Sequence, residues 1–413
     1  MLPILRRWLS LSFFNLLLVA LLGVTLRYKI AFSLPIIEQK FLLNSHSHFA
    51  FAGWITQTLI LLLVHQLGKI SGNNFFPRYK WILAANLFTA YGMLISFIFQ
   101  GYAFWSICFS TLSLFVSYAF AIYFWKDLNR FARERMSTYW FKAALFFSAS
   151  SSLGAYSLAF MMATKHVQQD WYLGSIYFFL HFQYNGWFFF AGMGLLTALI
   201  EQVTGSRKIL LRVFWLFAGA CIPAYLLSAL WLPFPFAIYL ILVAAVIAQL
   251  YGWTLMLIFF RKHAALLNPV FSPAGRWLLL LAGIALSIKI LLQSGSIHPG
   301  LSHLSYGFRP IIIGYLHLVL LAVTSLFLLG YIVNAGFVQP NKTLRGGLVV
   351  FVTGIIVNEL LLMLQGVMGL DYDVVPYITI FLFCAAIILL TGALFIWVGW
   401  LKKNNEETSI PSC

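Results

Sequence analysis

The sequence predicts an all-α membrane protein with twelve transmembrane helices in three pseudo-repeated four-helix units. The 413 residues are 62% hydrophobic and only 9% charged, a composition that a water-soluble domain cannot hide from solvent. Twelve apolar stretches approach the roughly 20 residues that a membrane-spanning helix needs. His48, His181 and His317 recur within such stretches, 133 and 136 residues apart. That period corresponds to about four membrane helices, which indicates three copies of one unit.

Each predicted helix is an apolar run bounded by charged or polar residues. No polar linker interrupts the runs, so we expect one membrane domain over residues 1–413, with pseudo-repeats of about 1–130, 131–265 and 266–413. The first run follows two arginines as a signal peptide does, but it is long and lacks a clear cleavage site, so we expect it to be retained. The runs cover residues 8–26, 41–68, 81–100, 104–125, 143–164, 172–200, 209–231, 235–260, 277–293, 310–335, 347–368 and 375–400.

The net charge of +16 is explained by membrane topology. Twenty of the 26 basic residues fall on one predicted side of the membrane, and the positive-inside rule then places both termini in the cytoplasm. This distribution argues against a nucleic-acid partner and for contact with membrane lipid. The four cysteines have no CxxC spacing, so neither a disulfide framework nor a thiolate metal site is indicated.

The three repeated histidines form the candidate functional constellation. His48 opens the string HFAFAGW and His181 opens HFQYNGW, and the two strings share Phe, an aromatic residue and Gly-Trp at the same offsets. The second, sixth and tenth helices run in one direction, so all three imidazoles lie some 10–14 Å below the outer face, at about 1.5 Å per residue. Imidazole is the usual nitrogen ligand of haem iron, copper and zinc, and an unpartnered imidazole in hydrocarbon is costly. The pattern therefore predicts a cofactor site.

Twelve helices without a soluble domain, in three units of four, resemble the catalytic subunit of the haem–copper oxidases. The resemblance implies that His48 and His317 hold one low-spin haem and that His181 is a copper ligand. Two departures make copper doubtful: Tyr315 stands where the family has another histidine, and the seventh helix, residues 209–231, contains no histidine. The resemblance therefore implies an incomplete copper site, and catalytic residues stay unassigned. The chain is also similar to the NnrS-type relatives, which are associated with nitric oxide metabolism.

The string NSHSHF offers two candidates on the second helix. His46 and His48 point about 200° apart, so only one faces a given ring. We predict His48 as the iron ligand because it alone keeps the spacing to Gly53 and Trp54 that His181 keeps to its own Gly-Trp pair. Gly53 would allow a macrocycle or a neighbouring helix to approach, and Trp54 is either a haem contact or a core aromatic. His46, nearer the outer water, would bind a propionate, a metal or the loop.

Other polar residues extend the predicted site. Arg309 precedes His317 by eight residues and is placed to meet a haem propionate. Lys289 and Glu359 lie at similar depth on the ninth and eleventh helices and are expected to form a buried ion pair, either structural or a remnant of a proton path.

His181, with Gln183 and Tyr184 close by in sequence, has three open interpretations. It is a vestigial copper ligand, a small-molecule contact or a hydrogen-bonded core group.

The favoured function is a haem-binding protein of the bacterial inner membrane, linked to respiratory electron transfer or nitric oxide metabolism. Because no CxxCH motif or soluble cytochrome domain is present, electrons would come from quinol, a cytochrome or other respiratory subunits. A twelve-helix secondary transporter is the main alternative. A non-redox structural subunit of a respiratory complex is the third.

Overall fold

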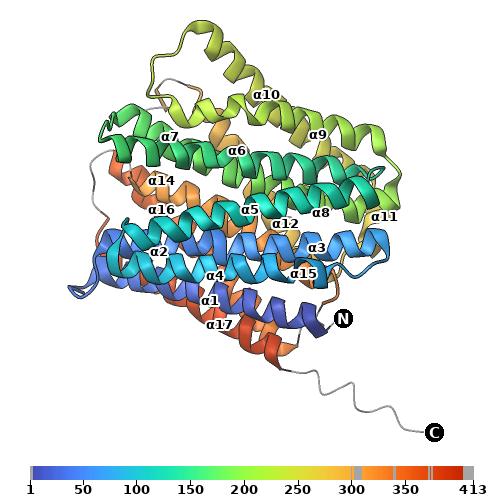
Figure 1. Ribbon diagram of the computed structural model, residues 1–413, viewed down its shortest axis with the longest axis horizontal. Helices are drawn as coiled ribbons and strands as arrows, with labels where there is room; N and C mark the ends of the chain where they lie inside the picture. Colours follow the sequence, from blue (N-terminus) through green and yellow to red (C-terminus); the bar gives the residue numbers. More distant parts are fainter. Residues whose placement is uncertain are drawn as a thin grey trace.

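Long helices cross the molecule from end to end, as the apolar runs predict (Figure 1). The computed structural model describes residues 3–298, 300–301, 309–337, 341–370, 373 and 375–402. Within these residues, eleven helices are long and apolar enough to span a membrane, and one bent pair completes a twelfth span. The described residues contain no strand, so the predicted all-α membrane class is confirmed.

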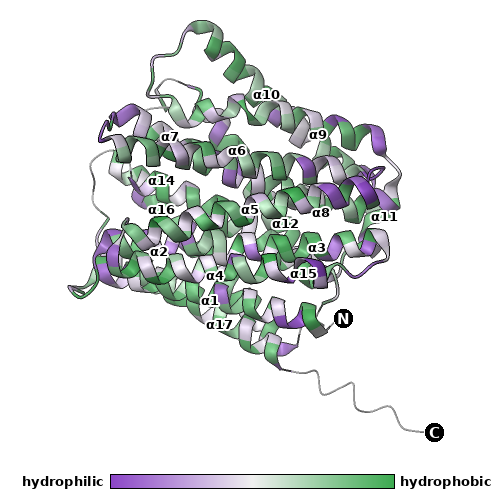
Figure 2. Ribbon diagram, viewed as in Figure 1, coloured by the Kyte–Doolittle hydropathy of each residue, from purple (hydrophilic) through white to green (hydrophobic). Residues whose placement is uncertain are grey.

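The spans extend several residues beyond most of the predicted runs, because the helices continue through polar residues at both ends (Figure 2). In order, they are α1 (Pro3–Ala31), α2 with η1 and α3 (Gln39–Phe49, Ala50–Thr56, Gln57–Ser71), α4 (Phe76–Gln100), α5 (Phe104–Phe131), α6 (Met136–Thr164), α7 with η2 and α8 (Gln169–His181, Phe182–Phe188, Phe189–Thr204), α9 with η3 (Arg207–Cys221, Pro223–Ala229), α10 (Phe236–Lys262), α12 (Pro273–Gly295), α14 with η5 and α15 (Arg309–His317, Leu318–Ser325, Leu326–Asn334), α16 (Lys342–Leu370) and α17 (Ile378–Leu401). The short elements α11 (Ala264–Leu267) and η4 (Asn268–Val270) connect α10 to α12.

The helices form a closed bundle, in which the last helix packs against the first. Helix α5 packs against α6, α10 packs against α12, and α17 packs against α1. The first residues of α1 and the last residues of α17 consequently lie at the same end of the bundle (Figure 1). These are the contacts that a ring of three four-helix units requires, although the repeat itself stays a prediction.

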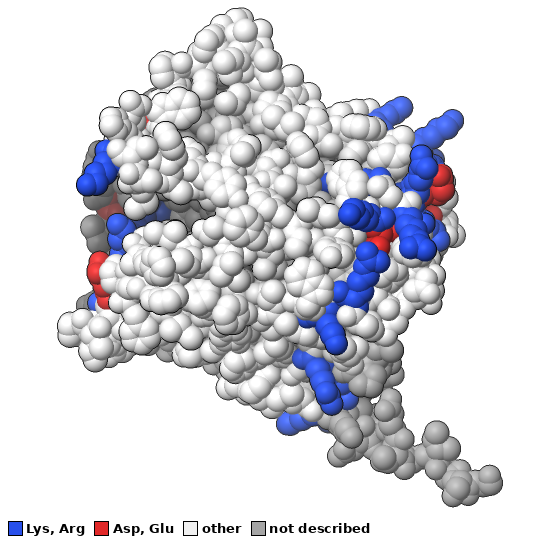
Figure 3. All heavy atoms as spheres, viewed as in Figure 1, with Lys and Arg blue, Asp and Glu red and all other residues white. Residues whose placement is uncertain are grey.

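Basic side chains gather at the end of the bundle where α1 begins and α17 ends (Figure 3). At that end Arg78 lies 3.0 Å from Asp127, and the Tyr79 hydroxyl donates to the same carboxylate at 2.6 Å. This distribution agrees with the one used to predict topology. The cytoplasmic location of both termini stays a prediction from the positive-inside rule.

Three spans are interrupted by a π-helical segment within two residues after a repeated histidine. Segment η1 begins two residues after His48, whereas η2 and η5 directly follow His181 and His317. Short π segments inside α-helices are rare and are frequent at functional sites. The sequence repeat thus corresponds to a repeated local distortion of the backbone.

Hydrogen bonds join these π segments at the centre of the molecule. The indole N–H of Trp54 in η1 donates to Ser325 Oγ in η5 at 2.9 Å. The indole N–H of Trp187 in η2 donates to Thr56 Oγ1 in η1 at 3.3 Å. Trp54 is only 1% exposed. In this structure it is a core aromatic residue.

Candidate functional site

His317, the last residue of α14, is hydrogen-bonded through one ring nitrogen to its own helix. Its Nδ1 lies 2.8 Å from the carbonyl oxygen of Ile313. Because a carbonyl only accepts, Nδ1 must carry the proton, and Nε2 keeps its lone pair. No described residue forms a hydrogen bond with Nε2. Metal-ligating histidines commonly donate their second N–H to a backbone carbonyl in this way.

His46 on α2 faces α1. Its Cε1 atom is 3.6 Å from the position that a Cβ on Gly23 of α1 would occupy. Its Nδ1 atom is buried and has no hydrogen-bond partner in the described structure. The imidazoles of His46 and His317 are close enough for their charges to interact. Two helices thus bring together two imidazoles, each with an uncommitted ring nitrogen.

His48 faces a different part of the molecule. Its Nε2 lies 2.8 Å from the hydroxyl of Tyr102, in the connection between α4 and α5. Its ring stacks on Phe97 of α4, with ring centres 4.4 Å apart. His46 and His48 therefore face different surroundings, as residues two positions apart on a helix do, and His46 is the one that interacts electrostatically with His317.

Arg27 on α1 adds positive charge between the two imidazoles and the outer end of the bundle. The guanidinium is within electrostatic range of both His46 and His317. It also interacts with the charges of Arg309 and Glu359. Sequence reasoning missed Arg27, although it is one of the few basic residues on the predicted outer side and therefore the kind of residue to examine.

The predicted ion pair between Lys289 and Glu359 is not formed. Glu359 on α16 accepts a hydrogen bond from Asn358 Nδ2 at 3.2 Å and interacts with Arg27. Lys289 on α12 lies near Cys221 and His181. The two residues belong to different sites because α16 packs mainly on α17 and α14, whereas α12 packs mainly on α15, η5 and α10.

His181 is a hydrogen-bonded core group, the third of its predicted interpretations. The imidazole is 1% exposed, and its Nε2 lies 2.8 Å from the carbonyl oxygen of Cys221. Nε2 must donate to that carbonyl, so Nδ1 accepts from Asn185 Nδ2 at 3.1 Å. Both ring nitrogens are therefore used, and neither is free to bind copper in this arrangement.

A bend in the seventh span supplies the acceptor for His181. The chain turns by 43° between α9 and η3, at Pro223. After the bend the Tyr225 N–H bonds to Ile222 O, three residues back, at 3.2 Å. An α-helix would have used Cys221 O instead. The carbonyl that the bend releases is the one that accepts from His181.

Gly53 and the two predicted tyrosines are accounted for by protein contacts. A Cβ on Gly53 would lie 2.6 Å from the Phe49 ring, and the Gly53 carbonyl accepts from Asn15 Nδ2 at 2.6 Å. The rings of Tyr184 and Tyr315 meet edge to face, with their centres 6.2 Å apart. Helix packing, the alternative to a macrocycle contact, thus explains Gly53.

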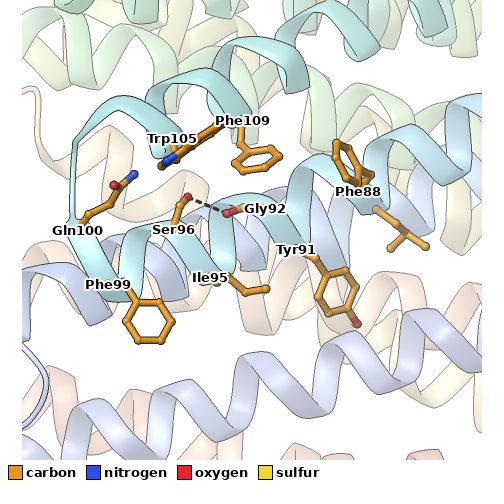
Figure 4. A pocket seen from close by; sticks show the side chains of 10 residues that line it. Phe88, Tyr91, Gly92, Ile95, Ser96, Phe99, Gln100, Trp105 and Phe109 are labelled. Atoms are coloured by element: carbon orange, nitrogen blue, oxygen red, sulfur yellow. Dashed lines mark hydrogen bonds between the residues drawn. The ribbon is translucent and has the colours of Figure 1, made fainter.

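A hollow of about 690 Å³ lies between α4 and α5 (Figure 4). Trp105 and Phe109 of α5 line it opposite Gly92 and Ser96 of α4, and the Ser96 hydroxyl is committed to the Gly92 carbonyl at 2.6 Å. None of its described lining residues is charged or a histidine. The hollow therefore offers apolar contact and no acid–base or metal chemistry.

No protein-family model matches this chain, and no curated protein matches it. Among the described residues, no three His, Cys, Asp or Glu side chains converge as they would around a metal ion held by protein alone. Haem iron is a different case, because the porphyrin supplies four nitrogens and the protein supplies only the axial ligands. A haem would need only two protein ligands, which is the number of imidazoles that His46 and His317 supply.

Proposed function

We propose that this protein binds one haem between α2 and α14, with His46 and His317 as its axial ligands, and transfers electrons within the membrane. The observation that carries the proposal is a pair of neighbouring imidazoles from separate helices, each with one ring nitrogen that no described residue engages. For His46 Nδ1, which is buried, the lack of a partner is costly unless a ligand satisfies it. The donor set therefore fits a haem.

The surrounding residues have roles that suit this ligand. The Ile313 carbonyl fixes the His317 tautomer and directs the lone pair of Nε2 away from its own helix turn. Arg27 and Arg309 lie near each other at the outer end, and guanidinium groups are good partners for carboxylates such as the haem propionates. A haem with both axial positions filled supplies one-electron transfer and does not bind oxygen.

The electron donor would be quinol, a cytochrome or another respiratory subunit. The proposal places the protein in a bacterial inner membrane, with respiratory electron transfer and nitric oxide metabolism as the two expected settings. Both settings require reduction and reoxidation of a membrane haem, which is the property to be measured first.

A secondary transporter is the second candidate, and the bend in the seventh span favours it. Transporters commonly build substrate sites at discontinuous helices near the middle of the membrane. Here the bend at Pro223 lies close to a buried lysine, Lys289. A transporter, like a non-redox structural subunit, would be colourless after purification.

The test is an absorption spectrum of the purified protein, oxidised and reduced, from cells supplied with a haem precursor. We expect a sharp Soret band and reduced α band, with about one haem per chain. His46→Ala and His317→Ala should each lose the haem or its bis-imidazole signal. His48→Ala, two residues from His46, is the matched control and should retain both.

Two results would contradict the proposal. A folded, monodisperse wild-type protein without haem bands would remove it and favour one of the colourless alternatives. Loss of the signal in His48→Ala with retention in His46→Ala would restore the axial pair predicted from the sequence.

A further inference from the structure

A second polar site lies within the bundle, around Lys289. A cavity of about 20 Å³ is bordered by Asn185 of η2, Cys221 of α9, Gln249 of α10 and Lys289 of α12. The remaining lining side chains are apolar: Phe189, Phe190, Phe217, Leu286 and Ile290. A space of this size holds one water molecule or one monatomic ion, because a water needs roughly 10–15 Å³ by the same measure.

Lys289 enters this cavity without a counter-charge. Its side chain is 7% exposed and forms no ion pair or hydrogen bond with a described residue. The titratable groups near it are the Cys221 thiol and the His181 imidazole, and no described lining residue is Asp or Glu. An isolated ammonium in the membrane interior is costly, so such groups normally pair with something.

The neighbouring carbonyl oxygen already has a donor other than Lys289. The Cys221 carbonyl, released by the bend at Pro223, accepts from His181 Nε2 at 2.8 Å and so does not need Lys289 as a donor. Asn185 keeps one N–H beyond the one it donates to His181. Gln249 is 9% exposed and has no hydrogen bond with a described residue, so its amide N–H₂ can turn into the cavity. Three lining groups can therefore donate into the cavity: the Lys289 ammonium and the amides of Asn185 and Gln249.

We propose that this cavity is a binding site for a small monovalent anion such as chloride. The Lys289 ammonium supplies the charge, and the amides of Gln249 and Asn185 supply additional hydrogen bonds. The volume selects against polyatomic anions such as sulfate. The site is independent of the proposed haem, which lies on α2 and α14, so either proposal can fail without the other.

The experiment measures thermal unfolding of the purified full-length protein in detergent, at fixed ionic strength, as gluconate is replaced by chloride. Because an anion that binds only the folded state stabilises it, we expect Tm to rise saturably with chloride. Lys289→Met should abolish the dependence. Gln249→Leu should raise the chloride concentration at half-effect about tenfold, the factor that 1.4 kcal/mol represents. Lys262→Met, an exposed lysine at the end of α10, is the matched control and should keep the wild-type response.

Two outcomes would overturn the proposal. If the wild-type Tm is the same in chloride and gluconate, Lys289 is neutral beside a water molecule and the cavity holds no anion. If chloride dependence persists unchanged in Gln249→Leu, the anion binds elsewhere; this variant decides the question even if Lys289→Met fails to fold.

Discussion

Replacing Ser325 with alanine removes the acceptor for an indole N–H at the centre of the molecule. Trp54 and Ser325 are each 1% exposed, and their hydrogen bond of 2.9 Å connects η1 to η5. A buried donor left without a partner costs about 1–3 kcal/mol. Side-chain hydrogen bonds within membrane proteins average about 0.6 kcal/mol, with a maximum near 1.7. We therefore expect Ser325→Ala to lower the free energy of unfolding by about 1–2 kcal/mol.

The assay is reversible unfolding in mixed micelles, with Trp54→Phe completing a double-mutant cycle. Ser325→Ala should cost about 0.6–1.7 kcal/mol less in the Trp54→Phe background, because no donor then remains to be stranded. Ser110→Ala is the control, since the Ser110 hydroxyl bonds only to Ser106 O in its own helix. If Ser325→Ala costs no more than Ser110→Ala, or if the two central changes are additive, the hydrogen bond does not hold the π segments together.

Two further predictions concern helix contacts, and both are measured as the free energy of unfolding. A Cβ on Gly392 would lie 2.5 Å from the backbone nitrogen of Phe351, so Gly392→Ala should force α16 and α17 apart at a cost of about 1–3 kcal/mol. Gly283→Ala, where nothing lies within 4 Å, should be neutral or stabilising by up to about 1 kcal/mol, and equal effects would refute the reasoning. The Glu201 carboxylate accepts a hydrogen bond from the Met136 N–H at 2.7 Å, at the start of α6. Because a negative charge stabilises a helix N-terminus, Glu201→Gln should lower the free energy of unfolding by about 0.5–1 kcal/mol. Glu134→Gln, on the exposed surface, is the control and should cost nothing. A loss in Glu201→Gln no larger than in Glu134→Gln would mean that the carboxylate charge does not stabilise the helix start.

The spans could be predicted because membrane insertion imposes a simple rule on composition and length. Every predicted run corresponds to a described span, including the seventh, which bends by 43°. The bend itself was not predicted, although Pro223 marks it, because proline is tolerated in membrane helices where neighbours satisfy the freed backbone groups. Here the neighbour is His181, which lies 40 residues earlier in the chain.

The partners of Lys289 and Glu359 could not be predicted from the depth of these residues in the membrane. Lys289 and Glu359 are each about twelve residues into their predicted runs, and that count gives a level along the bundle but no direction around the helix axis. The direction depends on which helices are neighbours, and α12 and α16 are not among the closely packed pairs of the described structure. The partners of Lys289 and Glu359 could therefore be assigned only from the tertiary structure.

The repeat identified histidines with equivalent local contacts, but it carried no information on which imidazole of α2 lies near His317. His48 and His181 occupy the same register before Gly-Trp, and each faces the third span of its own predicted unit: His48 meets Tyr102 just beyond α4, and His181 meets Cys221 in α9. Equivalent positions in a repeat have equivalent surroundings, so they are expected to make the same contact within each unit. His46 lies outside this register, and it is the imidazole on α2 that interacts electrostatically with His317.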